Sequence, residues 1–178
     1  TPASGIYSLV VGDIDGDGKP DLVTGAAYSG NSYVVNVVRN TSTSPGNISF
    51  ASVVNISSSG YYANGGICLG DINGDGKLDI ITTNQNSSQG VSVYTNISTV
   101  GSINFGSALI YSNSGVSTQG VAVGDINGDG KLDIVSAASN SPLVSVFKNI
   151  TTSTPTIVFA DRDDYSATGA SGGTGNIL

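Results

Sequence analysis

Three short segments of the chain carry most of its acidic side chains, in almost the same order each time. Each segment begins with Gly-Asp-Ile and runs through Gly-Asp-Gly-Lys to a final Asp. Ten of the thirteen acidic residues, all of them Asp, lie in these segments. Counted from the first Asp, side-chain oxygens stand at positions 1, 3, 5 and 9. These residues are Asp13, Asp15, Asp17 and Asp21; Asp71, Asn73, Asp75 and Asp79; and Asp125, Asn127, Asp129 and Asp133.

This spacing is typical of a metal-binding turn. Alternate residues in a tight loop can point their oxygens at one centre, and glycines at positions 4 and 6 permit the sharp bend. At position 7, occupied by Lys19, Lys77 or Lys131, we expect the backbone carbonyl to be the ligand and the side chain to point to water. Hard oxygen ligands in a flexible loop favour Ca²⁺ over Mg²⁺, which demands a tighter octahedral geometry.

Electrostatics also favours a bound cation. Two carboxylates about 4 Å apart repel by roughly 4 kcal/mol at an effective dielectric constant of about 20. A loop with three or four of them is therefore costly without a counter-ion. The sequence predicts three Ca²⁺ ions, one per segment, and predicts the tightest binding at the first loop, which alone has four carboxylates.

Two other interpretations fit parts of this pattern. An Asp/Gly-rich turn can be held by bonds from side chains to its own backbone, but three copies in the same phase make that less attractive. An EF-hand or dockerin-like loop needs a bidentate acid at position 12, followed by a helix. Position 12 is Thr24, Thr82 or Ser136, and the residues that follow have the pattern of a strand.

The composition excludes several classes of function. The chain has no His and no Glu, so it cannot build a Ser-His-Asp or Cys-His site, and zinc lacks its usual ligands. Six Lys and Arg residues against thirteen Asp give no basic face for nucleic acid. No apolar run is long enough to insert into a membrane. The single Cys68 allows no internal disulfide, and we expect it to be a small buried apolar residue.

Repetition extends beyond the acidic segments, whose first Asp residues are 58 and 54 residues apart. Four short runs rich in Val and Ile accompany each segment, separated by Gly, Ser and Asn clusters, as is typical of strands. A period near fifty residues is typical of propellers and solenoids. We therefore expect an all-β fold of three tandem four-stranded antiparallel propeller-blade-type repeats without a helix. The expected units are residues 1–58, 59–112 and 113–171, with fourth strands at Ile48–Phe50, Ile103–Phe105 and Ile157–Phe159.

The pattern resembles the FG-GAP/VCBS repeat family. The family's calcium motif, Asp-x-[Asp/Asn]-x-Asp-Gly-x-x-Asp between strands, is matched in each unit, and Phe105-Gly106 and Gly25-Ala26 resemble the elements that give the family its name. The stretches from Val38 and from Gly46 resemble its bacterial branch. The resemblance implies a propeller fold, calcium between strands and a secreted or surface location. It implies no single activity, because members serve in adhesion, in sugar binding and as accessory modules of enzymes.

The number of units departs from a complete propeller, which closes with four to eight blades. By spacing, residues 172–178 occupy the place of a fourth unit's first strand, so one end carries a spare strand. One hypothesis is that this strand is donated to a neighbouring subunit, which gives a head-to-tail filament or array. The other is that the chain is a piece of a longer propeller. Independently, the absence of Met and of a visible leader suggests a mature product or fragment without its targeting segment.

Three weaker signals complete the pattern. Asn40, Asn96 and Asn149 each begin an Asn-x-Ser/Thr sequence at the end of a third strand, so they are either glycan acceptors or turn residues. Tyr61-Tyr62 is either a sugar-stacking platform or a pair that covers the sheet. The cluster 161–164 is either a solvated edge that discourages wrong pairing or a further metal or interface site.

Together these features predict a non-enzymatic, extracellular, calcium-stabilised structural or adhesive repeat protein. Its expected partners are further copies of itself, head to tail, or other surface proteins and glycans, with no nucleic acid and no membrane insertion. The alternative is a carbohydrate-binding, lectin-like propeller module. A third possibility is an accessory segment of a secreted enzyme.

Overall fold

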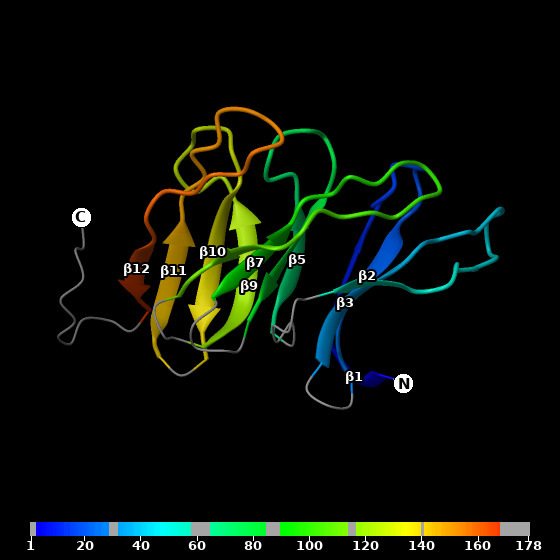
Figure 1. The fold of residues 1–178 in the computed structure, drawn as a ribbon, viewed down its shortest axis with the longest axis horizontal. Coiled ribbons are helices and arrows are strands. Elements are labelled where there is room, and N and C mark those ends of the chain that lie inside the picture. The colour runs from blue at the N-terminus through cyan, green and yellow to red at the C-terminus, as the bar shows by residue number, and fades with distance from the viewer. Residues whose placement is uncertain are drawn as a thin grey trace.

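The regular structure of the chain is a series of β-strands. A computed structural model describes residues 3–28, 32–57, 65–84, 90–113, 117–139 and 141–167. Within these ranges it contains no helix, and its strands form three separate four-stranded antiparallel sheets (Figure 1). The all-β prediction of tandem blade-type repeats is confirmed.

Each sheet is a simple meander in which every strand pairs with the next one along the chain. The first sheet consists of β1 (Ala3–Gly12), β2 (Asp21–Tyr28), β3 (Ser32–Val38) and β4 (Val54–Ser57). The second consists of β5 (Ile67–Gly70), β6 (Asp79–Thr83), β7 (Val91–Tyr94) and β8 (Leu109–Tyr111). The third consists of β9 (Thr118–Gly124), β10 (Asp133–Ala138), β11 (Leu143–Phe147) and β12 (Asp163–Ser166). We call the three sheets with their loops units 1, 2 and 3.

The exact division of the chain stays a prediction. The expected boundary between residues 58 and 59 and the expected spare strand at 172–178 lie outside the described residues.

The fourth strands lie later in the chain than the sequence predicted. The segment Ile48–Phe50 makes only an isolated bridge, between Asn40 and Phe50, and the regular strand β4 begins at Val54. Asn40 lies three positions after Val37, whereas Val54, the partner of Val37, lies four positions after Phe50, the partner of Asn40. The segment that leads through Phe50 to β4, which we call the returning arm, therefore has one more residue than the strand opposite, and its register shifts by one residue before regular pairing begins. The same shift precedes β8 and β12, after the bridges that Phe105 and Phe159 make.

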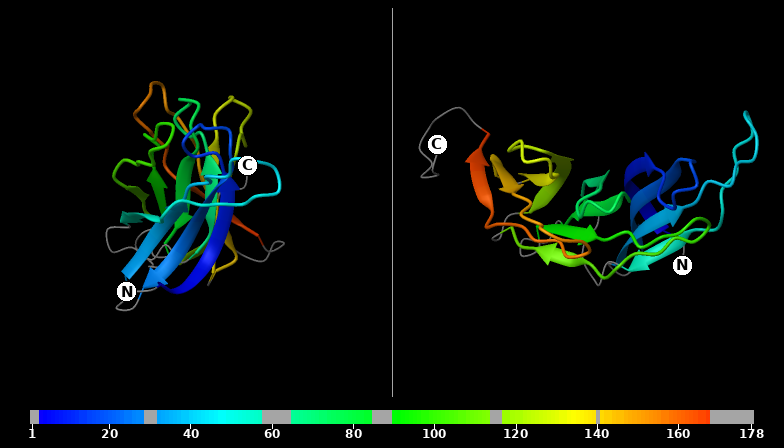
Figure 2. Two further views of the ribbon diagram at one scale, coloured as in Figure 1. Left: turned by 90° about the vertical axis from the view of Figure 1, so that its right-hand side faces the viewer. Right: turned by 90° about the horizontal axis from the view of Figure 1, so that it is seen from above.

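The three sheets stand side by side in chain order and follow a shallow curve when seen from above (Figure 2). Two hydrophobic clusters fill the spaces between them. The first combines Ile14, Val23, Val35 and Val37 of unit 1 with Ile67, Ile80 and Tyr94 of unit 2. The second combines Ile72, Ile81, Val91 and Val93 of unit 2 with Ile134, Phe147 and Ile157 of unit 3.

Alternation along the strands explains how one sheet serves both clusters. Successive side chains of a strand point to opposite faces, so Ile80 enters the first cluster and its neighbour Ile81 enters the second. Every residue of β6 and β7 is buried as a result. We call the face of a unit that is turned toward the preceding unit its leading face, and the opposite one its trailing face. Among the described residues no helix could span a membrane.

Candidate metal centres in the Asp loops

Each acidic segment forms the loop between the first and second strands of its unit. The last residue of the first strand pairs with the final Asp, as Gly12 pairs with Asp21, and this pairing closes the loop. The glycines at positions 4 and 6 have φ between +74° and +86° in all three loops, a conformation that favours glycine. This feature confirms the expectation from the sequence. The six residues are Gly16, Gly18, Gly74, Gly76, Gly128 and Gly130.

The Asp at position 9 ties its loop to the third strand of the sheet. Both oxygens of Asp21 accept backbone hydrogen bonds, one from the N–H of Ile14 at 3.0 Å and one from the N–H of Asn40 at 2.7 Å. The same two bonds recur at Asp79 and at Asp133, with distances between 2.8 and 3.1 Å. All three carboxylates are fully or almost fully buried.

The Asp at position 1 organises the turn itself. Asp13 accepts hydrogen bonds from the backbone N–H groups of Gly16, Asp17 and Gly18. Asp125 accepts the three equivalent bonds in its loop. Asp71 accepts two of them, from the N–H groups of Asp75 and Gly76. Such bonds are also what a purely structural Asp/Gly turn would make. They leave room for a metal, because a carboxylate has about four lone-pair sites.

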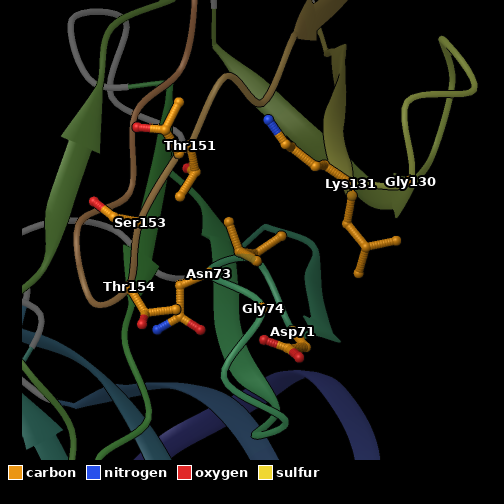
Figure 3. A pocket seen from close by; sticks show the side chains of 11 residues that line it. Asp71, Asn73, Gly74, Gly130, Lys131, Thr151, Ser153 and Thr154 are labelled. Carbon is orange, nitrogen blue, oxygen red and sulfur yellow. The ribbon is translucent and has the colours of Figure 1, made fainter.

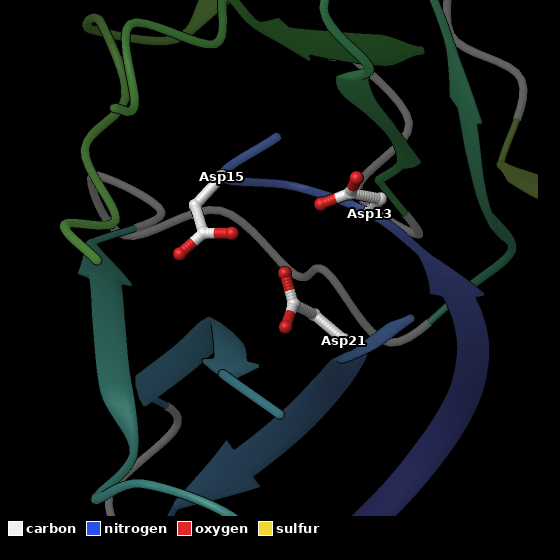
Figure 4. Close-up of side chains that lie close together, drawn as sticks. All are labelled: Asp13, Asp15 and Asp21. Carbon is white, nitrogen blue, oxygen red and sulfur yellow. The ribbon is translucent and has the colours of Figure 1, made fainter. Parts of the chain in front are cut away.

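Three carboxylates of the first loop converge. Asp13, Asp15 and Asp21 each place one oxygen within 4.8 Å of the others, and their side chains point into a shared space (Figure 4). Asp17, the fourth predicted ligand, is not part of this group and pairs with Lys19 instead. At the position of Asp15 the other loops carry Asn73 and Asn127, whose amide oxygens could serve as uncharged metal ligands.

Burial removes water from the position-9 carboxylates and so disfavours their negative charge. It raises the pKa of Asp79 to about 6, even though two backbone N–H groups act in the opposite direction and lower it. Burial likewise raises the pKa of Asp21, and the nearby charges of Asp15 and Asp17 add to the effect. A carboxylate that is buried among other carboxylates is stabilised by a cation. The all-oxygen donor set of these loops therefore fits Ca²⁺.

The chain supplies some counter-charge at the first loop. Arg39 Nη1 lies 3.8 Å from Asp15 Oδ2 and 3.9 Å from Asp17 Oδ2, and Lys19 Nζ lies 3.2 Å from Asp17 Oδ2. Burial tends to raise the pKa of Asp17, but the hydrogen bonds and charge of Lys19 and the charge of Arg39 outweigh it, so that its pKa is lowered.

Two lysines at position 7 are exposed to solvent in part and also have partners within the protein. Lys19 contacts Asp17, and Lys77 Nζ donates a hydrogen bond to the backbone oxygen of Ser98 at 2.8 Å. Sequence reasoning missed Arg39. The signal was its place next to Asn40, in a segment whose third-strand pairing brings it back toward the loop.

Each of the first two loops borders a cavity shared with the following unit. One cavity, of about 320 Å³, is lined by Asp13, Ile14, Asp15 and Gly16 of unit 1 and by Gly76, Lys77, Leu78 and Ser98 of unit 2. The other, of about 330 Å³, lies between Asp71 and Asn73 of unit 2 and the segment of unit 3 that contains Thr151 and Ser153 (Figure 3). The candidate metal loops therefore stand at the junctions between units.

The asparagines at the ends of the third strands bridge neighbouring units. Asn96 Nδ2 donates one hydrogen bond to the oxygen of Ile14 in unit 1 and one to the oxygen of Leu78 in its own loop, both at 2.9 Å. Asn149 Nδ2 makes the equivalent bonds to Ile72 and Leu132. Both side chains are fully buried.

A glycan is incompatible with these contacts, because its attachment replaces one of the two hydrogens that the nitrogen donates. The alternative of glycan acceptors at Asn96 and Asn149 therefore gives way to a structural role in this fold. Asn40 is partly exposed and donates to the oxygen of Pro20 in its own loop.

The remaining sequence signals have different outcomes. In the cluster 161–164, Arg162 donates two hydrogen bonds to the carboxylate of Asp164 and a third, from Nη1, to the oxygen of Ser112 in unit 2. This cluster therefore ties β12 to the preceding unit.

Cys68 is partly buried against the second hydrophobic cluster, and burial raises the pKa of its thiol to about 12. Tyr61 and Tyr62 lie outside the described residues.

Comparison with known protein families gives one result. A model of the FG-GAP-like repeat matches residues 13–82 and, in an overlapping second copy, residues 71–136. The two matches together cover more than half of the chain and include all three Asp loops. A search of curated proteins finds no match.

Proposed function

This chain belongs to the FG-GAP-like repeat family, and from that premise we propose that it is a non-enzymatic structural or adhesive repeat protein that is stabilised by calcium and works outside the cell. The family's repeats often bind calcium and are typical of extracellular or surface proteins. Membership in the bacterial branch stays a prediction.

The observation that carries the proposal is the convergence of Asp13, Asp15 and Asp21. Three oxygens from three carboxylates surround one space, and Asp21 is buried there with a raised pKa. A bound Ca²⁺ would supply the positive charge that these groups lack. In the other loops the corresponding ligands would be Asp71, Asn73 and Asp79, and Asp125, Asn127 and Asp133.

The loops themselves explain why a metal would stabilise the whole row of units. Ile14 follows Asp13 directly and is buried in the first hydrophobic cluster, and Asp15 Oδ2 accepts a hydrogen bond from the N–H of Gly101 in unit 2 at 2.8 Å. A loop held in one conformation therefore keeps the junction with the next unit in place. This arrangement suits a load-bearing or adhesive role.

The residue types favour a role without catalysis. The chain has neither His nor Glu, and ten of its thirteen Asp residues lie in the loops. The carbohydrate-binding alternative gains no comparable support. The two cavities beside the Asp loops have no aromatic residue in their lining. In a third cavity, between residues 54–56 of unit 1 and 103–108 of unit 2, the aromatic residue is Phe105, which packs against the first hydrophobic cluster. Stacking on aromatic rings is the contact that such a site would need.

Calcium titration with thermal unfolding tests the proposal. We expect three Ca²⁺ per chain by calorimetry and a large fall in the melting temperature in excess chelator. Saturation of one site at a hundred times its Kd adds about 2.7 kcal/mol to the free energy of unfolding. Asp21→Asn, Asp79→Asn and Asp133→Asn should each remove or weaken one site.

Asp161→Asn, an exposed change outside the loops, is the matched control and should keep all three sites. An unchanged melting temperature in chelator would contradict the calcium role. A hydrolytic or transferase activity that survives purification would contradict the non-enzymatic assignment.

A further inference from the structure

The two junctions within the chain have one geometry. At each, an isoleucine from the Asp loop of one unit enters the hydrophobic cluster shared with the next unit. Ile14 and Ile72 are each 2% exposed as a result. The backbone oxygen of the same residue accepts a hydrogen bond from the bridging asparagine of the next unit, Asn96 or Asn149.

A glycine gives each junction its close fit. A Cβ atom on Gly12 would lie 2.6 Å from Leu69 Cδ1 and 2.8 Å from Leu78 Cδ1 of unit 2. A Cβ atom on Gly70 would meet Val123 and Leu132 of unit 3 at 2.9 and 3.0 Å. Nothing larger than glycine fits there without movement of the neighbouring unit.

The trailing face of unit 3 has the same parts, and none of the described residues of another unit packs against them. Ile126, the counterpart of Ile14 and Ile72, is 61% exposed. Among the described residues, a Cβ atom on Gly124, the counterpart of Gly12, would meet only Ile126 Cδ1 of its own loop, at 3.7 Å. The apolar residues Val135, Val144 and Val146 are only partly buried, whereas their counterparts in unit 2 are fully buried.

The leading face of unit 1 has the complementary parts, also uncovered. Leu9 and Val11 are 56% and 57% exposed, although their counterparts Ile67 and Leu69 pack into the first cluster. Ile48 and Phe50 are exposed as well. The second Nδ2 hydrogen of Asn40, which in the other units goes to a preceding loop, has no partner among the described residues.

We propose that the trailing face of unit 3 docks onto the leading face of unit 1 of a second copy of this chain, and so repeats the internal junction between molecules. Ile126 would enter the second copy's cluster, Gly124 would receive Val11 and Pro20, and Asn40 would donate to the oxygen of Ile126. The two internal junctions are the template for this contact. The inference deepens the proposed structural role and depends on it.

Charge also matches across the contact. In the internal junctions Lys77 and Lys131 lie beside the acidic loop of the preceding unit, in the two cavities already described. Lys19 is the counterpart of Lys77 and Lys131 in unit 1 and would face the acidic third loop. The contact is heterologous, so repetition closes a ring or extends a filament. Two copies supply six units, within the range in which propellers close, and a dimer is the expected species.

Sedimentation of the purified chain with calcium in excess measures the association. Gly124→Leu and Ile126→Gln alter the trailing face, and Leu9→Gln with Val11→Gln alters the leading face. Each should weaken association by about tenfold to hundredfold, since overpacking or loss of burial costs about 1–3 kcal/mol. Ile97→Gln is the control, because Ile97 is 50% exposed in unit 2 and belongs to neither outer face.

Mixing separates head-to-tail docking from a symmetric contact. A trailing-face variant and the leading-face variant should each be monomeric alone, yet form a one-to-one dimer when mixed, because the mixture contains one intact face of each kind. Association that a trailing-face variant leaves unchanged would overturn the proposal. So would a wild-type chain that stays monomeric up to its solubility limit. Calcium-dependent melting of the same samples shows separately whether the proposed function holds.

Discussion

At the scale of single residues, the first Asp loop differs from the others in the charges around it. It has four carboxylates, but Arg39 and Lys19 approach two of them. The corresponding neighbours of the other asparagines are Thr95 and Lys148. The order of affinity therefore depends on both the ligands and the local cations, and the expectation that the first loop binds most tightly stays a prediction.

We predict that Arg39→Gln raises the calcium affinity of the first loop by about tenfold. A guanidinium 3.8 Å from Asp15 competes electrostatically with a bound cation. A factor of ten in affinity corresponds to about 1.4 kcal/mol, which is less than the roughly 4 kcal/mol of attraction between a guanidinium and a carboxylate at about 4 Å and an effective dielectric constant of about 20. Calorimetric titration measures the change. Lys148→Gln, an exposed position of unit 3, should leave the first site unchanged, and a weaker first site in Arg39→Gln would refute the prediction.

Asp164 gives the protein a pH-dependent contribution to stability. Burial tends to raise its pKa, but hydrogen bonds from Arg162 and Ser145 and the charge of Arg162 outweigh it, so that the pKa is lowered below its ordinary value of 3.8. A lowered pKa means that the folded state binds this proton more weakly than the unfolded state. The stabilisation is therefore present above about pH 4 and is lost as the pH falls below that value.

Comparison of Asp164→Asn with the wild type should show this dependence. We expect the variant to be less stable near neutral pH and the difference to shrink as the pH falls through the acid range, measured by urea unfolding in chelator. Asp163→Asn, an exposed neighbour, is the control. A difference that grows toward low pH would have the wrong sign.

The sequence predicted the residue types of the site better than their contacts. The spacing of the Asp residues was sufficient to place them in one turn, because the spacing is local. The approach of Arg39 and the fold-back of Lys77 onto Ser98 depend on strand pairing between residues about twenty apart, so the local pattern could not reveal them.

At the scale of the elements, the bridging asparagines hold neighbouring sheets together. We predict that Asn96→Ala or Asn149→Ala lowers the free energy of unfolding by about 2–3 kcal/mol, because one buried and one partly buried carbonyl group lose their donor in each case. Chemical denaturation measures the loss.

Asn40→Ala provides the comparison within the same chain. Asn40 Nδ2 bonds only to the partly exposed Pro20 oxygen of its own unit, so we expect a cost of at most about 1 kcal/mol for a monomer. Equal losses at all three positions would show that the bridge between units contributes nothing.

Strand prediction failed in one consistent way. The triplets Ile48–Phe50, Ile103–Phe105 and Ile157–Phe159 have the composition of strands, and they do lie on the returning arm that leads to β4, β8 and β12. The one-residue shift in register that separates them from regular pairing depends on how the connection between the third and fourth strands of each unit folds. Alternation of residue types does not encode such a shift.

At the scale of the whole molecule, the charge of the protein depends on its metal content. The formal charge at pH 7 is −7, and three divalent ions would bring it to −1. We predict that native electrophoresis in calcium shows much slower migration toward the anode than in chelator. A variant with Asp21→Asn and Asp79→Asn should show a smaller change, and an identical mobility in both buffers would contradict a load of three ions.

The overall plan was largely predictable from repetition, whereas the way the units pack was not. Three copies of one pattern indicate three similar sheets, because each copy has the same turns and apolar runs. Which face of a sheet meets which neighbour depends on residues such as Gly12 and Leu69, which lie in different copies of the pattern. Only the folded arrangement shows that a side chain at Gly12 would displace the leucine side chains of the next unit.

The double attachment of each position-9 carboxylate has a consequence for how such a protein can diversify. The bond from Asp to the asparagine fixes one edge of every sheet, yet the two residues are 19, 17 and 16 positions apart in the three units. The length of the second and third strands differs as well, since β2 and β3 have eight and seven residues whereas β6 and β7 have five and four. The edge of a sheet opposite the anchored Asp can therefore change in length while the anchored edge keeps its geometry, which makes the chain a scaffold with one constant rim and one variable rim.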